Sequence, residues 1–187
     1  VENVQMALQS VLGQSWSMLA AADELQRERA LALLTDVGMA GDGERPINTL
    51  AYGDIKRVEL AIALASQPKL LLMDEPTAGM APREREALMS LVRRLARAQR
   101  IGVLFTEHDM DMVFGFADRV IVLDRGRIVA HGTPAEIRAD PQVQAVLRAR
   151  GRDVEESLDL VGLLARVERF QVVVGRFIGL PRFLHRR

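Results

Sequence analysis

The stretch Leu70-Leu71-Leu72-Met73-Asp74-Glu75-Pro76 joins a short apolar run to two adjacent carboxylates. Four consecutive apolar residues that end at a turn signal are typical of a strand buried on both faces of a parallel sheet. Proteins of the α/β class build their ligand sites where such strands end. We therefore expect a buried strand over residues 70–73 that carries Asp74 and Glu75 into a site at its carboxyl end.

The two carboxylates can take different roles because side chains alternate in direction along a strand. In nucleotide hydrolysis, a first carboxylate holds the Mg²⁺ shell, and a second carboxylate beside it can polarise the attacking water. Taken alone, the motif is equally compatible with an acidic strand end that faces solvent. The elements and motifs on either side of residues 70–76 are therefore needed to choose between these interpretations.

The surrounding elements alternate between helices and strands. Apolar residues at helical spacing predict helices, and short apolar runs predict strands. Residues 1–40 are expected to be largely helical, and the predicted order after them is helix 55–66, strand 70–73, helix 82–97, strand 101–105, helix 110–117, hairpin strands 120–123 and 127–130, and helix 134–148. Helices that connect successive strands imply an α/β fold with a parallel sheet.

Two further motifs carry residue types that suit a phosphate. Leu50-Ala51-Tyr52-Gly53-Asp54 precedes a predicted helix, where small residues let backbone N–H groups approach an anion. Thr106-Glu107-His108-Asp109 follows the strand 101–105, and a histidine there can hydrogen-bond a phosphate oxygen or orient a water. Each motif also has a simpler interpretation, an N-cap by Asp54 and a surface histidine.

Composition excludes several classes of protein. The chain has 187 residues, of which 49% are hydrophobic, with 25 basic and 25 acidic side chains. This balance is not that of a disordered chain or of a broadly basic nucleic-acid binder. The absence of cysteine excludes disulfides, thiolate metal sites and a cysteine nucleophile within this sequence. None of its apolar runs approaches the roughly 18 residues that a membrane span needs.

The order and spacing of the motifs resemble the nucleotide-binding domain of ABC transporters. The matching segments are residues 50–54 with the signature loop, the strand ending in Asp74-Glu75-Pro76 with the Walker B motif, residues 77–82 with the D-loop, and Glu107-His108-Asp109 with the H-loop. The resemblance covers about residues 1–147. It is strongest to the ATP-binding subunits of branched-chain amino acid importers, with urea or amide importers as close competitors.

The resemblance implies a role for each matched residue. Asp74 is implied as a Mg²⁺ ligand, Glu75 as the catalytic base and His108 as the switch that contacts the γ-phosphate of ATP. The signature loop is implied to touch an ATP molecule held by the opposite subunit of a head-to-tail dimer, and the D-loop to signal across that interface. The implied nucleotide-site positions in these two loops are Leu50, Ala51, Tyr52, Gly53, Asp54, Gly79, Met80 and Ala81.

The sequence departs from the family pattern in three matched positions. The usual signature serine is Ala51, the glycine after it is Tyr52, and the usual D-loop aspartate is Ala81. Loss of one hydrogen-bond donor in a catalytic site can cost on the order of 10²–10³ in rate. The efficiency of hydrolysis with Ala51 is therefore an open point.

A larger departure is the phosphate-binding P-loop, which requires Gly-x-x-x-x-Gly-Lys-Ser/Thr. The sequence holds only two lysines, Lys56 and Lys69, and neither is followed by serine or threonine. Val1–Val4 matches sequence that follows the glutamine loop in an intact cassette. We therefore expect impaired ATP binding and reduced stability for this chain by itself, and whether it hydrolyses ATP as an enzyme stays open.

The resemblance implies an α/β fold of the P-loop NTPase class, present in part, with a parallel sheet core and a helical subdomain. Residues 1–48 correspond to the helical subdomain, of which residues 1–45 are implied to meet membrane permease subunits. Residues 49–147 correspond to the C-terminal part of the ATPase core. Residues 148–187 form an Arg-rich tail that does not match the family ending and that we expect to be poorly ordered.

The leading hypothesis is a truncated ATP-binding and ATP-hydrolysing subunit of an ABC importer for branched-chain amino acids, with ATP and Mg²⁺ as cofactors. Its expected partners are a second ATP-binding subunit and the permease, which would hold it at the cytoplasmic face of the cell membrane, and no nucleic acid. The alternative is a non-catalytic module that lends its signature loop to a P-loop-bearing partner. A role in DNA maintenance or translation is disfavoured, because the sequence shows neither long heptad repeats nor a second cassette.

Overall fold

The chain forms two compact units in a computed structural model. The helical unit comprises Val1–Leu71 and Thr77–Ile101, and the sheet unit comprises Leu72–Pro76 and Gly102–Arg187. The structure describes residues 1–11, 20–124, 127–145 and, for the backbone, 170–176. The functional boundaries expected at residues 48 and 147 stay predictions.

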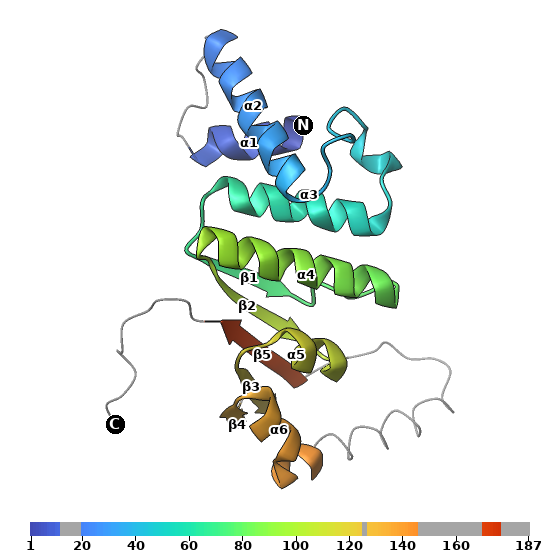
Figure 1. The fold of residues 1–187 in the computed structure, drawn as a ribbon, viewed down its shortest axis with the longest axis vertical. Coiled ribbons are helices and arrows are strands. Elements are labelled where there is room, and N and C mark those ends of the chain that lie inside the picture. The colour runs from blue at the N-terminus through green and yellow to red at the C-terminus, as the bar shows by residue number, and fades with distance from the viewer. Residues whose placement is uncertain (12–19, 125–126, 146–169, 177–187) are drawn as a thin grey trace. The chain divides into compact units, whose positions relative to one another are not determined.

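In the described part of the helical unit, α1, α2, α3 and α4 are the α-helices (Figure 1), and their buried apolar side chains form an aliphatic core. Helix α1 contacts both α2 and α3, and α3 also contacts α4. The core is built from the apolar stripes of these helices, among them the buried side chains of Val4, Leu8, Leu34, Val58, Leu64 and Leu88. The bounds of its helices are Glu2–Val11 for α1, Ala20–Asp36 for α2, Ile47–Thr49 for the short 3₁₀ helix η1, Tyr52–Ala65 for α3 and Pro82–Gln99 for α4.

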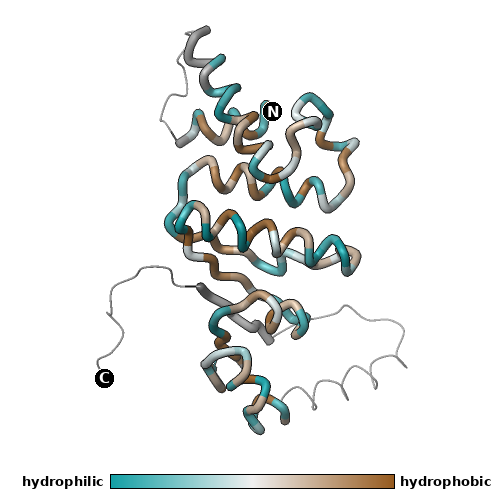
Figure 2. The backbone as a smooth tube through the Cα atoms, viewed as in Figure 1, coloured by the Kyte–Doolittle hydropathy of each residue, from teal (hydrophilic) through white to brown (hydrophobic). Residues whose placement is uncertain are grey.

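Helix α4 confirms the helix predicted over residues 82–97. The side chains of Leu88, Val92 and Leu95 are 2%, 3% and 4% exposed, as their spacing along one helix face predicts. Figure 2 shows apolar and polar residues alternating along this helix. Pro82 stands in the first turn, where its missing N–H costs nothing, and Arg100 ends the helix in the left-handed conformation at φ 56°.

The sheet unit is built on a five-stranded sheet with the order β1-β2-β5-β3-β4. Strands β2 and β3 are each antiparallel to β5, so they run in the same direction without being neighbours. Strands β3 and β4 form the predicted antiparallel hairpin. The bounds are Leu70–Asp74 for β1, Gly102–Glu107 for β2, Val120–Asp124 for β3, Arg127–Gly132 for β4 and Phe170–Arg176 for β5, with helices Met110–Phe116 (α5) and Pro134–Ala139 (α6).

Strand β5 is a difference from the sequence-based expectation. Residues 148–187 were expected to be poorly ordered, whereas the backbone of residues 170–176 pairs with a strand on each side. The consecutive Val172, Val173 and Val174 have high strand propensity. The expectation of poor order rested on the arginines of the tail and did not weigh these valines. The remainder of that tail lies outside the described residues.

Strand β1 also differs from the expectation of burial on both faces. Leu71 is 8% exposed, whereas Leu70 and Leu72 are 48% and 67% exposed. Side chains alternate along a strand, so Leu71 lies on a covered face of β1, whereas Leu70 and Leu72 lie on an open face. The continuous apolar run 70–73 does not distinguish a strand with one covered face from a strand buried on both faces.

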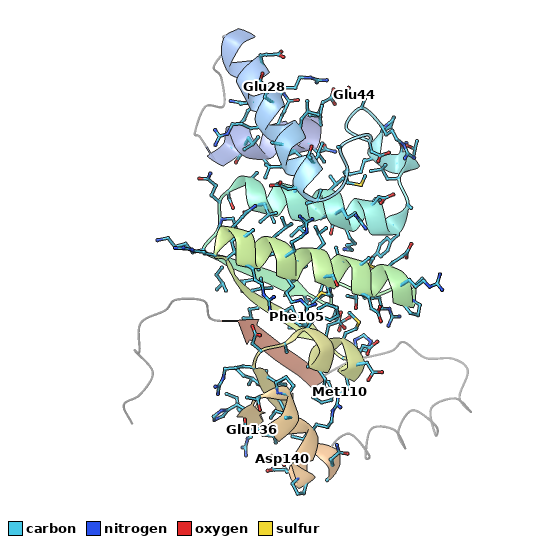
Figure 3. The ribbon with its side chains drawn as sticks, in the orientation of Figure 1. Glu28, Glu44, Phe105, Met110, Glu136 and Asp140 are labelled. Carbon is cyan, nitrogen blue, oxygen red and sulfur yellow. The ribbon has the colours of Figure 1, made fainter. Side chains whose placement is uncertain are left out.

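Helix α6 is shorter than the predicted helix 134–148, because Asp140 and Pro141 interrupt it. Asp140 Oδ1 accepts hydrogen bonds from the backbone N–H groups of Gln142 and Val143, and residues 141–145 form a further helical turn. Figure 3 labels Asp140 at this break and Glu136 in the first turn of α6.

The start of α6 is a capping box between Thr133 and Glu136. The Thr133 backbone N–H donates to Glu136 Oε2 at 2.7 Å, and the Thr133 hydroxyl accepts from the Glu136 N–H at 3.3 Å. The backbone hydrogen bond from Thr133 lowers the pKa of Glu136, followed in effect by the side-chain hydrogen bond. The contribution of this cap is therefore present at neutral pH and is lost as the pH falls through the lowered pKa.

We predict that Met89→Ala destabilises the helical unit by about 2–5 kcal/mol, because it leaves a cavity in the core. Met89 is 2% exposed in α4. Met6→Ala is the matched control, since Met6 is 59% exposed in α1 and its truncation should cost less than about 0.5 kcal/mol. Urea denaturation followed by circular dichroism measures both, and equal losses in the two variants would contradict this core assignment.

Candidate functional site

The carboxyl ends of β1 and β2 are joined by the side chain and backbone of Thr106. The Glu75 backbone N–H donates to the Thr106 carbonyl oxygen at 3.1 Å and to its hydroxyl oxygen at 3.1 Å. The Thr106 hydroxyl group donates to the Asp74 carboxylate. Asp74 is the last residue of β1, and Glu75 follows it in a left-handed conformation at φ 42°. The sheet unit therefore holds both predicted acidic residues at one sheet edge.

His108 lies beside this pair. It follows the last residue of β2, and its Nδ1 atom is 3.7 Å from Glu75 Oε1. Both side chains are exposed, at 60% and 45%, so they can be reached from solvent. The next residue, Asp109, caps α5 by accepting from the N–H groups of Asp111 and Met112. Asp74, Glu75 and His108 thus lie in one cluster at the carboxyl ends of β1 and β2.

The acidic cluster holds few of the ligands that a metal ion can bind. Within the described residues, no group of three or more histidine, aspartate or glutamate side chains has the arrangement of a protein metal cage. Mg²⁺ does not need one, because it is commonly held by one or two carboxylates, water and the phosphates of a substrate. Asp74 fits that mode, since its carboxylate stands exposed at the strand end.

The predicted signature loop lies in the helical unit and forms the beginning of α3. Helix α3 starts at Tyr52, three residues before the predicted start, so Gly53 and Asp54 belong to its first turn. Ala51 is the N-cap in extended conformation, and its methyl side chain makes no capping hydrogen bond. A helix N-terminus without a side-chain cap presents backbone N–H groups that can bind an anion.

The predicted D-loop lies against the same helix start. Gly79 has φ 74°, and a Cβ atom built there would be 3.8 Å from the Tyr52 ring. Met80 is buried, and its carbonyl oxygen accepts a 2.7 Å hydrogen bond from Arg85 Nε. Ala81 is the N-cap of α4, and its backbone N–H donates to Glu84 Oε2 at 3.3 Å.

The beginnings of α3 and α4 line one pocket of about 200 Å³, which we call the helix-start pocket. It contains residues from both predicted loops together with two arginines and two carboxylates. Its lining comprises Ala51, Gly53, Asp54, Arg57, Met80, Arg83, Glu84 and Ala87. The structure therefore brings Ala51, Gly53 and Asp54 of the first loop into one pocket with Met80 of the second.

Sequence reasoning missed Arg57 and Arg83. Arg57 follows Gly53 by four positions and so lies one turn further along the same helix face, a spacing that could have indicated it. Its Nη1 atom also donates to the Val37 carbonyl oxygen at 3.2 Å, which anchors the side chain. Arg83 joins the pocket through the approach of two helix starts, which no local pattern shows.

Lys56 lies on α3 beside the signature loop. Its Nζ atom is 2.9 Å from Glu59 Oε2 and 5.4 Å from the centroid of the Tyr52 ring. The hydrogen bond to Glu59 raises the pKa of Lys56, against the opposing effect of burial. Lys56 is therefore a permanent cation at neutral pH that helps hold the exposed Tyr52 ring.

Comparison with known proteins places these motifs in a family. Residues 2–78 match the family model described as ABC transporter, and residues 127–146 match one described as branched-chain amino acid ATP-binding cassette transporter. Over these residues the chain is similar to the ABC transporter family. The match over residues 2–78 includes Leu50–Asp54, Asp74 and Glu75.

Curated relatives include ATP-binding proteins of branched-chain amino acid transport. The chain is 40% identical over 116 residues to the high-affinity branched-chain amino acid transport ATP-binding protein LivG of Salmonella typhimurium. It is 37% identical over 116 residues to the corresponding protein BraF of Pseudomonas aeruginosa. Both alignments cover 62% of this chain and 46% of the relative, so the chain spans just under half the length of these curated relatives.

Solved structures support the same fold. The cassette matches cbiO1 of Clostridium perfringens with a TM-score of 0.61 and 29% identity, covering 82% of this chain and 61% of that one. It also matches an ABC transporter cassette in its ADP conformation with a TM-score of 0.65 and 26% identity, covering 78% and 61%. In the part of the chain that the structure describes, no helix is both long and apolar enough to span a membrane.

We predict that Gly79→Ala destabilises the helical unit by about 1–2 kcal/mol, the cost of placing a Cβ in the left-handed region. Gly41→Ala is the matched control in the same unit, because its Cβ would meet nothing within 4 Å and its φ is not positive. Denaturant titration of the two variants measures the difference. A stability for Gly79→Ala equal to that of Gly41→Ala would contradict the conformation assigned to the D-loop.

Proposed function

We propose that this chain contributes to the ATP-binding and ATP-hydrolysing subunit of an ABC importer for branched-chain amino acids. The observation that carries the proposal is the cluster of Asp74, Glu75 and His108 at the ends of β1 and β2. The substrate class rests on the names of the relatives and on the family model that matches residues 127–146.

Each residue of the acidic cluster is given one task in this proposal. Asp74 holds Mg²⁺ through one carboxylate, while the other ligands are phosphate oxygens and water. Glu75 accepts a proton from the water that attacks the γ-phosphate. His108 contacts the γ-phosphate, and its 3.7 Å separation from Glu75 keeps the two side chains within reach of the same reacting group.

The helix-start pocket serves an ATP molecule held by another subunit. Within the loop Leu50–Asp54, the residues Ala51, Tyr52 and Gly53 offer backbone N–H groups at the uncapped start of α3, whereas the N–H groups of Leu50 and Asp54 donate to the Ile47 and Ala51 carbonyl oxygens. Ala51 lacks the hydroxyl donor of the usual serine, and the side chains of Arg57 and Arg83 supply positive charge in the same pocket. Gly79, Met80 and Ala81 complete the face that the partner contacts.

The proposed partners follow from this incomplete arrangement. A second ATP-binding subunit supplies the opposite half of each nucleotide site, and residues 1–45 contact the permease subunits. Contact with the permease holds the assembly at the cytoplasmic face of the cell membrane. ATP-driven closure of the dimer then moves the permease.

A second candidate function is a non-catalytic module that supplies its signature loop to a P-loop-bearing partner. The observation that favours it is that the sequence contains no Gly-x-x-x-x-Gly-Lys-Ser/Thr segment. In this case the helix-start pocket is used while Asp74 and Glu75 are not. The two candidates therefore differ in which residues hydrolysis requires.

The test supplies a P-loop-bearing segment as a separate fragment. The chain is co-expressed with the P-loop-bearing N-terminal fragment of the Salmonella LivG protein, and ATP hydrolysis is measured. We predict that Glu75→Gln lowers the rate by about 10²–10⁴, because the attacking water loses its base. Glu86→Gln, on the exposed face of α4, is the matched control and should leave the rate unchanged.

A complex in which Glu75→Gln hydrolyses ATP at the unaltered rate would contradict the catalytic proposal. The module is tested by mixing the chain with intact LivG. ATP hydrolysis by LivG is the quantity measured. An increase in this rate would support the module instead if it persists when the chain carries Glu75→Gln and disappears when Gly53 of the chain is replaced by a bulky residue.

A further inference from the structure

The hydroxyl group of Thr106 occupies a central place in the acidic cluster. It donates its one proton to Asp74 Oδ1 and accepts the Glu75 backbone N–H at 3.1 Å. A threonine hydroxyl has one donor and two acceptor lone pairs, so a single group can make both bonds. Thr106 is thus hydrogen-bonded to both residues that the proposed function places at the reaction centre.

The same contact bears on the backbone of Glu75. Its φ of 42° is in the left-handed region, which a residue with a Cβ rarely adopts without support from surrounding structure. The Glu75 N–H is held by the carbonyl oxygen and by the hydroxyl oxygen of Thr106. This conformation directs the Glu75 carboxylate to within 3.7 Å of His108 Nδ1.

We infer that Thr106 is a positioning residue that fixes Asp74 and Glu75 relative to each other. The roles of the two carboxylates in this inference rest on the proposed function, whereas the hydrogen bonds of Thr106 are observed independently of it. The donated hydrogen bond engages Oδ1 of Asp74, so Oδ2 is the oxygen that would bind a divalent cation. Partners of this kind, one shell removed from a metal, commonly change metal affinity when they are removed.

Side-chain direction along β2 supports this assignment. Phe105 and Glu107, the neighbours of Thr106, are buried, whereas Thr106 is half-buried on the opposite face of the strand. Thr106 therefore contributes little to the core of the sheet unit compared with its neighbours. Valine keeps the shape of threonine and removes the hydroxyl, while serine keeps the hydroxyl, so the two substitutions separate packing from hydrogen bonding.

The test uses the full 187-residue chain and two readouts that do not depend on hydrolysis. The first is amide hydrogen exchange at Glu75, measured by nuclear magnetic resonance. We predict that Thr106→Val exchanges roughly tenfold faster there, because a hydrogen bond to the amide is lost. Thr106→Ser should exchange at the wild-type rate. Thr35→Val is the matched control, because the exposed Thr35 hydroxyl bonds only the Leu31 carbonyl of its own helix.

The second readout is paramagnetic broadening of amide signals by Mn²⁺ near Asp74. We predict that Thr106→Val raises the Mn²⁺ concentration needed for half-maximal broadening roughly tenfold. Thr106→Ser and Thr35→Val should behave as wild type, and Asp74→Asn should abolish the effect. These variants assign the broadening to the Asp74 carboxylate and its orientation.

The outcomes separate the inference from the proposed function. Unchanged exchange at Glu75 in Thr106→Val overturns the inference, and so does an equal acceleration of β3 amides, which would make Thr106 a general stabiliser of the sheet. Faster exchange confined to Glu75, without Mn²⁺ broadening in wild type, supports the positioning role and contradicts the metal task proposed for Asp74.

Discussion

The hydrogen bond from the Glu75 amide to the backbone of Thr106 ties the end of β1 to the end of β2, and the acidic cluster depends on it. The constraint is geometric, because carboxylates become a site only when two strand ends meet at the same edge of a sheet. Here one strand contributes Asp74 and Glu75, and the other contributes Thr106 and His108. Each of these residues is ordinary by itself, and their chemistry arises from this junction.

The helical unit presents a second surface, the helix-start pocket. Helix α3 begins without a side-chain cap, whereas the Glu84 side chain accepts the N-cap backbone N–H of α4, and Arg57 and Arg83 line the pocket at these two helix starts. Anions are stabilised at helix N-termini by free N–H groups and by the helix dipole. The chain thus combines a surface suited to Mg²⁺ and water with a surface suited to phosphate. In the proposed dimer, the two surfaces act on nucleotides bound by different chains.

Much of this arrangement could be predicted from local sequence patterns. The run 70–73 predicted a strand with Asp74 and Glu75 at its end, and apolar spacing predicted the buried stripe of α4. What the sequence could not show depends on contacts between distant segments. The open face of Leu72, the pairing of β5 with β2 and β3, and the bridge through Thr106 all require knowledge of which elements become neighbours.

The central claim is that the signature loop of this chain faces a nucleotide held by a second ATP-binding chain. The absence of cysteine in the sequence allows a clean test by disulfide formation. Ala51→Cys is mixed with an intact cassette that carries a single cysteine in its P-loop, and the cross-linked species is quantified with and without ATP. We predict that Ala51→Cys forms a cross-link to the P-loop cysteine in the presence of ATP. A cross-link that is absent, or equally strong without ATP, would contradict it.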